Sequence, residues 1–227
     1  MSEICTRIEA VRTRIRTAAQ ATGRKPETVG LVAVGKTFPA AAIRAAWACG
    51  QRAFGENYVD EFAGKAAELA DLDIEWHFIG HLQSNKTRKV AALAHWVHGI
   101  DRLSVAERLD RQRPPELPPL QVCLQVNISG ETSKSGVAPE TATALAQAVI
   151  ALPRLHLRGL MALPAPDNDP TVQRAAFARV RTLKDALVDA GITLDTLSMG
   201  MSGDLDAAVA EGATLVRIGT AIFGSRA

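Results

Sequence analysis

Hydrophobic residues at the start of the chain follow a helical pattern, and a short apolar run comes after it. One stripe of a helix over residues 3–21 carries Ile4, Ile8, Val11 and Ile15. Their spacings of four, three and four positions match the helical repeat. The run at residues 29–35 carries no charge and is rich in β-branched side chains, as is typical of a strand buried on both faces.

The same strand-then-helix unit recurs along the rest of the chain. The predicted strands comprise residues 29–35, 52–55, 75–79, 96–100, 120–127, 155–163, 194–199 and 214–219. Helical patterns cover residues 39–49, 139–151, 170–190 and 205–211. Strands that alternate with helices in this way predict an α/β fold, a closed parallel (β/α)8 barrel of the TIM type. We expect a single domain over residues 1–227, with the N-terminal helix as an addition to the barrel.

Two segments are irregular in this scheme. Residues 220–227 are too few for a full closing helix after the last strand, so the amphipathic N-terminal helix could cover that gap. The proline-rich residues 113–119 are compatible with an interdomain linker or with a stiff loop before the fifth strand. We favour the loop.

Composition excludes several classes of protein. A length of 227 residues suits one α/β barrel. No apolar stretch approaches the roughly 18 residues of a membrane span. The net charge of +2 and the 4% of aromatic residues provide neither a strong basic field nor a stacking surface for nucleic acid. We therefore expect a soluble protein with no membrane and no nucleic-acid partner.

The cysteines and the N-terminus bear on the cellular compartment. Cys5, Cys49 and Cys123 are odd in number and far apart, and they match neither a disulfide framework nor a metal or redox pair. This pattern favours reduced thiols. The first residues also lack the basic region and apolar run of a secretory signal. We expect a cytoplasmic protein.

Candidate ligand-binding residues follow from the barrel itself, because such barrels bind ligands at the carboxyl ends of their strands. The residues at those positions are Lys36, Glu56, Asn57, His81, Asn127, Met161, residues 198–203 and residues 217–220. Lys36 directly follows an uncharged run, so burial there would lower its pKa and leave a nucleophilic amine that can form a Schiff base. The alternative is a lysine that extends into solvent from a strand end.

The loops after the last two strands have the composition of a phosphate site. Residues 198–204 combine hydroxyls and glycines just before a predicted helix, whose first N–H groups attract anions. Taken alone, this segment is also compatible with an ordinary serine N-cap. Gly219 and Thr220 end the neighbouring strand, and barrels of this type often hold phosphate at these two loops. The pair therefore favours phosphate binding.

Other polar groups are less informative. His77 and His81 have no carboxylate or cysteine set beside them to complete a metal site, so we predict no metal. The basic residues 83–89 most simply form the solvated start of a helix, although a phosphorylated or nucleic-acid partner is an alternative. Glu56 and Asn57 are compatible with a helix start, with a polar contact to a ligand, or with both.

Together these segments resemble the pyridoxal 5′-phosphate (PLP) homeostasis protein family, whose fold is similar to the N-terminal barrel of alanine racemase. The resemblance spans nearly the whole chain. It rests on VGK at 34–36, FGENY at 54–58, WHFIGHLQ at 76–83, RGLM at 158–161, LSMGMS at 197–202 and VRIGTAIFG at 216–224. Each motif is weak alone, but their order and spacing are specific.

The resemblance implies a site in which Lys36 holds PLP as a Schiff base. It further implies that the cofactor phosphate is bound by Ser202, Gly203, Gly219 and Thr220. Arg217 would face the pyridine nitrogen, where a permanent cation disfavours protonation and makes the ring a poorer electron sink. Asn57 would be a further cofactor contact.

The function implied is vitamin B6 homeostasis without catalytic turnover. The expected partners are PLP and PLP-dependent apoenzymes, and the expected state is a monomer or weak dimer. One alternative is a PLP-dependent racemase, but racemases of this fold take a second base from a β-rich domain, and the only tyrosine here, Tyr58, follows the second strand. Another alternative is a cofactor-free enzyme that acts on a phosphorylated metabolite with Lys36 as its amine.

Overall fold

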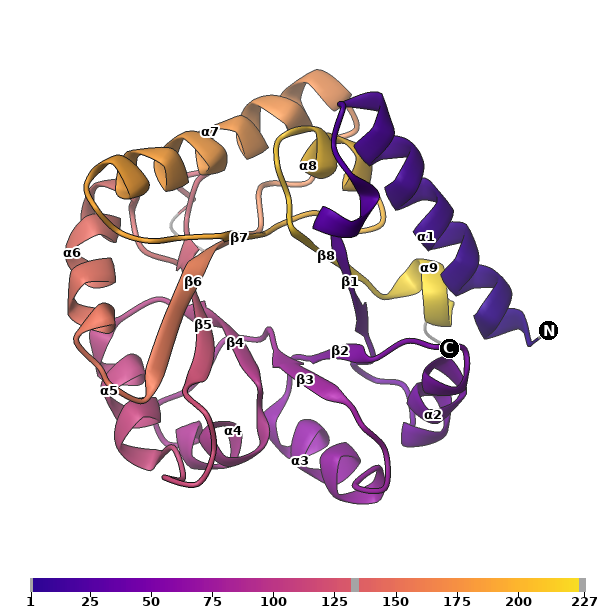
Figure 1. The fold of residues 1–227 in the computed structure, drawn as a ribbon, viewed down its shortest axis with the longest axis horizontal. Helices are drawn as coiled ribbons and strands as arrows, with labels where there is room; N and C mark the ends of the chain where they lie inside the picture. The colour runs from indigo at the N-terminus through magenta and orange to yellow at the C-terminus, as the bar shows by residue number, and fades with distance from the viewer. Residues whose placement is uncertain (1, 132–134, 225–227) are drawn as a thin grey trace.

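The computed structural model describes residues 2–131 and 135–224. Its strands form a closed barrel in the order β1 to β8, and each pair of neighbours is parallel. The barrel closes where β1 pairs with β8, from Gly30 opposite Leu215 to Ala33 opposite Ile218. Figure 1 shows the strands at the centre with helices around them. The predicted barrel is confirmed.

The element bounds lie within two residues of most predicted ones. The strands are β1 (Gly30–Val34), β2 (Ala53–Glu56), β3 (Glu75–Phe78), β4 (Trp96–Ile100), β5 (Leu120–Val126), β6 (Leu155–Ala162), β7 (Thr196–Ser198) and β8 (Leu215–Ile218). The helices are α1 (Glu3–Ala21), α2 (Ala40–Ala48), α3 (Val59–Glu68), α4 (Thr87–Leu93), α5 (Leu103–Gln112), α6 (Pro139–Ile150), α7 (Pro170–Asp189), α8 (Leu205–Ala210) and α9 (Thr220–Phe223), with a 3-10 turn at Pro26–Thr28.

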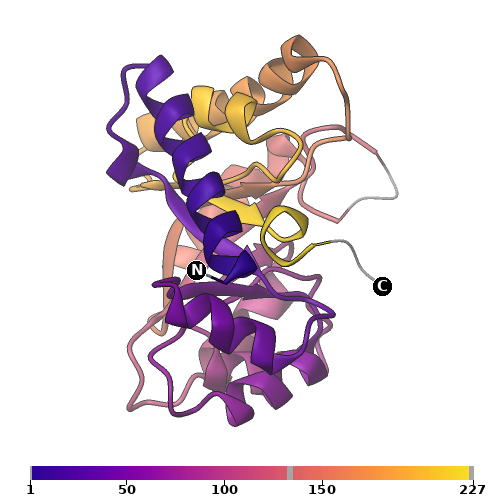
Figure 2. The same ribbon diagram turned by 90° about the vertical axis from the view of Figure 1, so that its right-hand side faces the viewer.

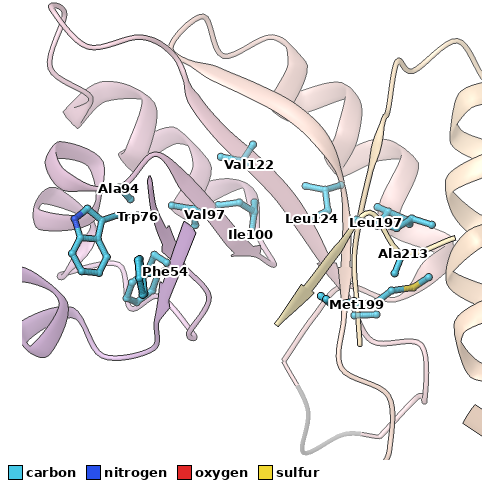
Figure 3. Close-up of a cluster of buried hydrophobic side chains, with 14 of the residues drawn as sticks. Phe54, Trp76, Ala94, Val97, Ile100, Val122, Leu124, Leu197, Met199 and Ala213 are labelled. Atoms are coloured by element: carbon cyan, nitrogen blue, oxygen red, sulfur yellow. The ribbon is translucent and has the colours of Figure 1, made fainter. Parts of the chain in front are cut away.

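Most buried side chains lie between the strands and the helices. Ten of them are labelled in Figure 3: Phe54, Trp76, Ala94, Val97, Ile100, Val122, Leu124, Leu197, Met199 and Ala213. Because side chains alternate along a strand, the residues between these positions point to the other side of the sheet, which is the interior of the barrel.

The barrel interior is part apolar and part polar. A small separate cluster consists of Trp96, Cys123 and Met161, with Leu215 packed against it. The polar members alternate with residues of the outer core, and they include His77, His98, Ser198 and Arg217. All four are buried. Polar groups in such surroundings require hydrogen-bond partners, and these are described with the site.

The N-terminal helix covers the gap that the short α9 leaves. α1 packs against α8, α9 and α2, and Figure 2 shows it beside the yellow turn of α9. Its buried stripe includes Ile8, Val11 and Ile15. The proline-rich segment lies between α5 and β5 as a connection within the barrel, so the loop prediction is confirmed. No helix within the described residues is long and apolar enough to cross a membrane.

The expectation of three reduced thiols is wrong for Cys5 and Cys49. These two form a disulfide with a Cα–Cα separation of 5.2 Å. Cys5 lies on α1 and Cys49 caps α2, and the packing of these helices brings together residues 44 positions apart. Spacing along the chain carries no sign of this contact. Cys123 is a buried free cysteine, as expected of an interior position.

Candidate functional site

One cavity collects all seven cofactor-binding residues predicted from the sequence. It has a volume of about 510 Å³ and lies at the carboxyl ends of the strands. The seven are Lys36 after β1, Asn57 after β2, Ser202 and Gly203 after β7, Arg217 in β8, and Gly219 and Thr220 after β8. They come from opposite ends of the sequence, and the closure of the barrel between β1 and β8 brings them together.

Of the other candidates, Met201 also lines the cavity, and the rest lie elsewhere. Met161 and Ser198 are inside the barrel, and Asn127 donates to the carbonyl oxygen of Glu131. His81 lines a neighbouring pocket that shares only Asn57 with the cavity. The described residues contain no group of histidine, cysteine and carboxylate side chains able to hold a metal ion.

A buried ion-pair network supports the segment that carries Lys36. Lys65 Nζ on α3 lies 2.7 Å from Glu56 Oε1 and 2.6 Å from Glu61 Oε1, and it donates to the carbonyl oxygen of Gly35 at 2.8 Å. Glu61 Oε1 also accepts the backbone N–H of Thr37 at 2.6 Å. Thr37 has φ of 69°, a strained conformation for a β-branched residue. The network therefore holds the backbone on both sides of Lys36.

Glu56 lies behind the strand end, away from the cavity lining. Burial raises the pKa of its carboxyl group to about 7, although the hydrogen bond and positive charge of Lys65 act in the opposite direction. A side chain at position 35 would come within 2.8 Å of Glu56 Oε1, so Gly35 leaves the space that this carboxyl group occupies. Glu56 is thus a support for the loop of Lys36.

Asn57 presents an unused acceptor. Its Oδ1 atom is buried and has no hydrogen-bond partner within the described residues, and the residue lines the cavity. The close approach of Gly80 maintains this position, because a Cβ atom at Gly80 would lie 2.0 Å from the carbonyl oxygen of Asn57. A buried polar atom without a partner is costly, so this oxygen fits a ligand that donates a hydrogen bond.

The far side of the cavity carries two hydroxyls and two glycines. The loop of Ser202 and Gly203 is held from outside by Arg14 on α1, whose Nη1 donates to the carbonyl oxygen of Ser202 at 2.6 Å. The same guanidinium pairs with Asp206 on α8 at 2.8 Å. Thr220 begins the single turn α9, where first-turn N–H groups lack intrahelical partners. This side of the cavity suits an anion.

Arg217 forms part of the wall of the cavity and is almost fully buried. Its Nη1 donates to Ser198 Oγ at 2.7 Å and its Nη2 donates to the carbonyl oxygen of Ala162 at 3.0 Å. Burial lowers the pKa of Arg217 to about 10, while Asp204 raises it slightly, so the side chain is a cation at neutral pH.

Sequence reasoning missed Lys65, Arg14 and most of the apolar rim. Lys65 and Arg14 act through neighbours, and only tertiary contacts reveal them. The apolar part of the cavity is formed by Val34, Ile79, Leu163, Pro164, Pro166 and Met201. Of these, Leu163, Pro164 and Pro166 follow β6, where the candidate named from the sequence was Met161.

Comparison with known families first defines the class of the protein. The family described as "Alanine racemase, N-terminal domain" matches residues 7–227. This match agrees with the closed parallel barrel and with a ligand cavity at the carboxyl ends of its strands. The protein is a barrel of the alanine racemase type.

Close relatives narrow this class. The chain is 63% identical to the pyridoxal phosphate homeostasis protein of Pseudomonas aeruginosa, over 100% of this chain and 97% of the relative. It is 51% identical to the protein of that name in Escherichia coli K12, over 100% and 98% of the two chains. The chain therefore belongs to the pyridoxal phosphate homeostasis protein family.

A solved structure supports the same assignment. PipY of Synechococcus elongatus PCC7942, solved with PLP bound, is 40% identical, with a TM-score of 0.86. The match covers 98% of this chain and 100% of PipY. PipY without PLP matches with a TM-score of 0.87. The fold predicted from the sequence is thus also found in an experimentally solved relative.

Proposed function

We propose that this chain is a single domain over residues 1–227 that binds PLP covalently through Lys36 and serves vitamin B6 homeostasis without catalytic turnover. One observation carries the proposal. The amine of Lys36, the acceptor Asn57, the cation Arg217 and the hydroxyls of Ser202 and Thr220 line a single cavity of about 510 Å³. Relatives in the same family are named for PLP homeostasis, and PipY has been solved with PLP bound.

The residues present fit this cofactor. When bound, PLP supplies an aldehyde carbon with which a lysine amine condenses, with the release of water. Lys36 is the amine at the cavity, and Ser202, Gly203, Gly219 and Thr220 bind the phosphate at the far side. The partnerless Oδ1 of Asn57 accepts a hydrogen bond from the ligand.

The surroundings of Arg217 support the absence of turnover. A buried cation beside the pyridine nitrogen disfavours its protonation and so weakens the ring as an electron sink. Tyr58, the only tyrosine in the sequence, is 56% exposed and lines the neighbouring pocket instead of the Lys36 cavity. A tyrosine base across from Lys36 is therefore missing from the cavity lining of the described residues.

The proposed partners follow from this role. We assign PLP-dependent apoenzymes as acceptors of the cofactor, a cytoplasmic location, and a monomer or weak dimer that binds neither nucleic acid nor membrane. The exposed apolar side chains Leu163 and Met201 at the cavity provide a surface on which an acceptor protein could approach the cofactor.

Borohydride reduction of the PLP-loaded protein tests the proposal. The carbon–nitrogen bond to PLP is reducible, so peptide mass mapping should find the label on Lys36. Lys36→Arg keeps the charge and should take no label, whereas the control Lys184→Arg on α7 should be labelled as in wild type.

Label on another lysine with Lys36 unmodified would show that the amine was assigned wrongly. Protein that stays colourless with added PLP would contradict the proposal as a whole. Racemisation of alanine in proportion to PLP content would contradict the absence of turnover.

A further inference from the structure

A continuous row of polar side chains runs through the buried interior of the barrel, starting at the cavity. Arg217 Nη1 and His98 Nδ1 each lie 2.7 Å from Ser198 Oγ. His98 Nε2 lies 2.9 Å from His77 Nδ1. The row connects β8, β7, β4 and β3, and each of its four members is buried.

Glu75 and Trp96 hold the far end of the row. His77 Nε2 lies 3.5 Å from Glu75 Oε1, and the His77 ring stacks on Trp96 with centroids 5.5 Å apart. Trp96 Nε1 donates to the same carboxylate at 2.6 Å. The His77 ring lowers the pKa of Glu75, while partial burial acts in the opposite direction. A carboxylate therefore faces His77 Nε2 at neutral pH.

Donor and acceptor chemistry gives the row a direction. Arginine can only donate, so Ser198 Oγ accepts from Arg217 and directs its own proton to His98 Nδ1. Burial lowers the pKa of His98 well below its ordinary value, and the neighbouring His77 ring and the positive charge of Arg217 lower it further. The His98 ring is neutral and has one proton, which then sits on Nε2 and is donated to His77 Nδ1.

The opposite direction is unfavourable at both ends. Ser198 Oγ would accept two bonds, and its proton would have no acceptor among the hydrogen bonds of residues 2–131 and 135–224. His77 Nε2 would also turn its lone pair towards the Glu75 carboxylate. In the favoured direction, His77 Nε2–H faces that carboxylate at 3.5 Å instead, so the hydrogen bonds run one way from Arg217 to His77.

We propose that His98, held by His77, is a positioning residue. It accepts the hydrogen bond of the Ser198 hydroxyl, so that Ser198 Oγ accepts from Arg217 and fixes its guanidinium in the cavity wall. Two anchors hold this guanidinium, Ser198 Oγ and the carbonyl oxygen of Ala162. With the first anchor weakened, the group can rotate about the second. The inference rests on the proposed function, because the orientation of Arg217 concerns PLP only if PLP occupies this cavity.

Nuclear magnetic resonance of the PLP-free protein tests the row without reference to the cofactor. Ring nitrogen shifts should show the Nε2–H tautomer for both His98 and His77. The Arg217 side-chain N–H signals should be sharp in wild type and broadened in His98→Phe and in Ser198→Ala. Leu109→Val on α5, which alters the core outside the barrel strands, should leave them sharp.

PLP affinity tests the consequence for the cofactor. His98→Phe should raise the dissociation constant about tenfold in the wild-type background, because a hydrogen bond to a charged group is weakened. In an Arg217→Gln background the same substitution should have less than about a twofold effect, since the two residues act through one contact. Ser198→Ala, a smaller change, should reproduce both results.

The outcomes separate the two proposals. An Nδ1–H tautomer of His98, or Arg217 signals that stay unchanged in both His98→Phe and Ser198→Ala, would contradict the proposed positioning of Arg217 even if PLP binds. Equal losses of affinity in the two backgrounds would show general destabilisation and would also overturn it. Failure of wild type to take up PLP, with the tautomers and Arg217 signals as expected, would contradict the proposed function and leave the positioning of Arg217 supported.

Discussion

Lys65 and Arg217 are buried cations near the cavity, and each has several partners. Lys65 contacts Glu56, Glu61 and a backbone carbonyl, whereas Arg217 contacts a hydroxyl and a backbone carbonyl, with no carboxylate of the described residues within hydrogen-bond distance. Buried charges are tolerated only when they are paired or hydrogen-bonded. The incomplete pairing of Arg217 leaves part of its charge available to a ligand in the cavity.

The two hydroxyls at the far side of the cavity give a direct prediction about single residues. Ser202→Ala combined with Thr220→Val should weaken PLP retention, because each lost hydrogen bond to a charged group is worth about 1.5–3 kcal/mol. Dialysis against a competing amine, followed by absorbance, measures the retention. The control pair Ser104→Ala and Thr141→Val alters exposed positions on α5 and α6 and should behave as wild type. Equal PLP retention in the two double variants would show that the phosphate binds elsewhere.

Glu56 should make stability depend on pH. Its pKa is about 7 in the folded chain against an ordinary 4.5, so the folded state holds a proton that the unfolded state has lost between these values. Its contribution to stability is therefore full below about pH 4.5 and is lost as pH rises through about 7. The pKa difference corresponds to roughly 3 kcal/mol.

Glu56→Gln should remove this dependence. Relative to wild type, the variant should gain free energy of unfolding as pH rises from 5 to 8, measured by urea denaturation at each pH. Glu68→Gln, an exposed change on the same helix as Lys65, serves as the control and should show no such trend. A constant difference between Glu56→Gln and wild type across this range would contradict the raised pKa.

Among the elements, α1 has two roles. It covers the gap that α9 is too short to fill, and it reaches the phosphate side of the cavity through Arg14. The ion pair of Arg14 with Asp206 is weak, because the two side chains are 40% and 62% exposed. The hydrogen bond to the Ser202 carbonyl is partly buried and fixes the loop itself.

Loss of the Arg14 side chain should therefore lower the affinity for PLP more than it lowers the stability of the fold. Arg14→Ala should weaken PLP binding by about 1 kcal/mol, the typical net worth of one hydrogen bond. Arg16→Ala is the matched control, since Arg16 lies on the same helix but donates to Glu9 and Thr13 of α1 itself. Fluorescence titration with PLP measures both. Equal affinities for the two variants would show that α1 does not support the loop.

For the whole molecule, the site depends on joining distant parts of the chain. Lys36 lies near one end and Thr220 near the other, and barrel closure makes them neighbours in the cavity. The Cys5–Cys49 disulfide adds a covalent link between α1 and α2 at the N-terminal side of this closure. Unfolding that separates α1 from the barrel therefore disturbs the cavity.

Reduction of the disulfide should lower global stability. A link between residues 44 positions apart restricts the unfolded chain, which is typically worth about 2–4 kcal/mol. Denaturation of wild type with and without reductant should show this loss. Cys5→Ser combined with Cys49→Ser should match the reduced protein and should not respond to reductant. If reductant leaves the unfolding curve of wild type unchanged, the predicted stabilisation by the Cys5–Cys49 disulfide is wrong.

The hydrophobic pattern by itself determined the fold and most of the cavity. Strand–helix periodicity predicted the barrel, and the residues at the strand ends included the seven predicted cofactor-binding residues that the cavity brings together. This succeeds because burial dictates residue type locally, and parallel strands all end at the same face of the barrel.

Only the tertiary structure decided how those residues are supported. The Cys5–Cys49 disulfide, the contact of Arg14 with the Ser202 loop and the ion pairs of Lys65 are set by which helices pack side by side. Likewise, His98 meets Ser198 across 100 positions of sequence. Such contacts form between polar or reactive side chains. The hydrophobic pattern of the sequence does not show whether such a side chain contacts another residue or solvent. Their partners exist only once the barrel has closed.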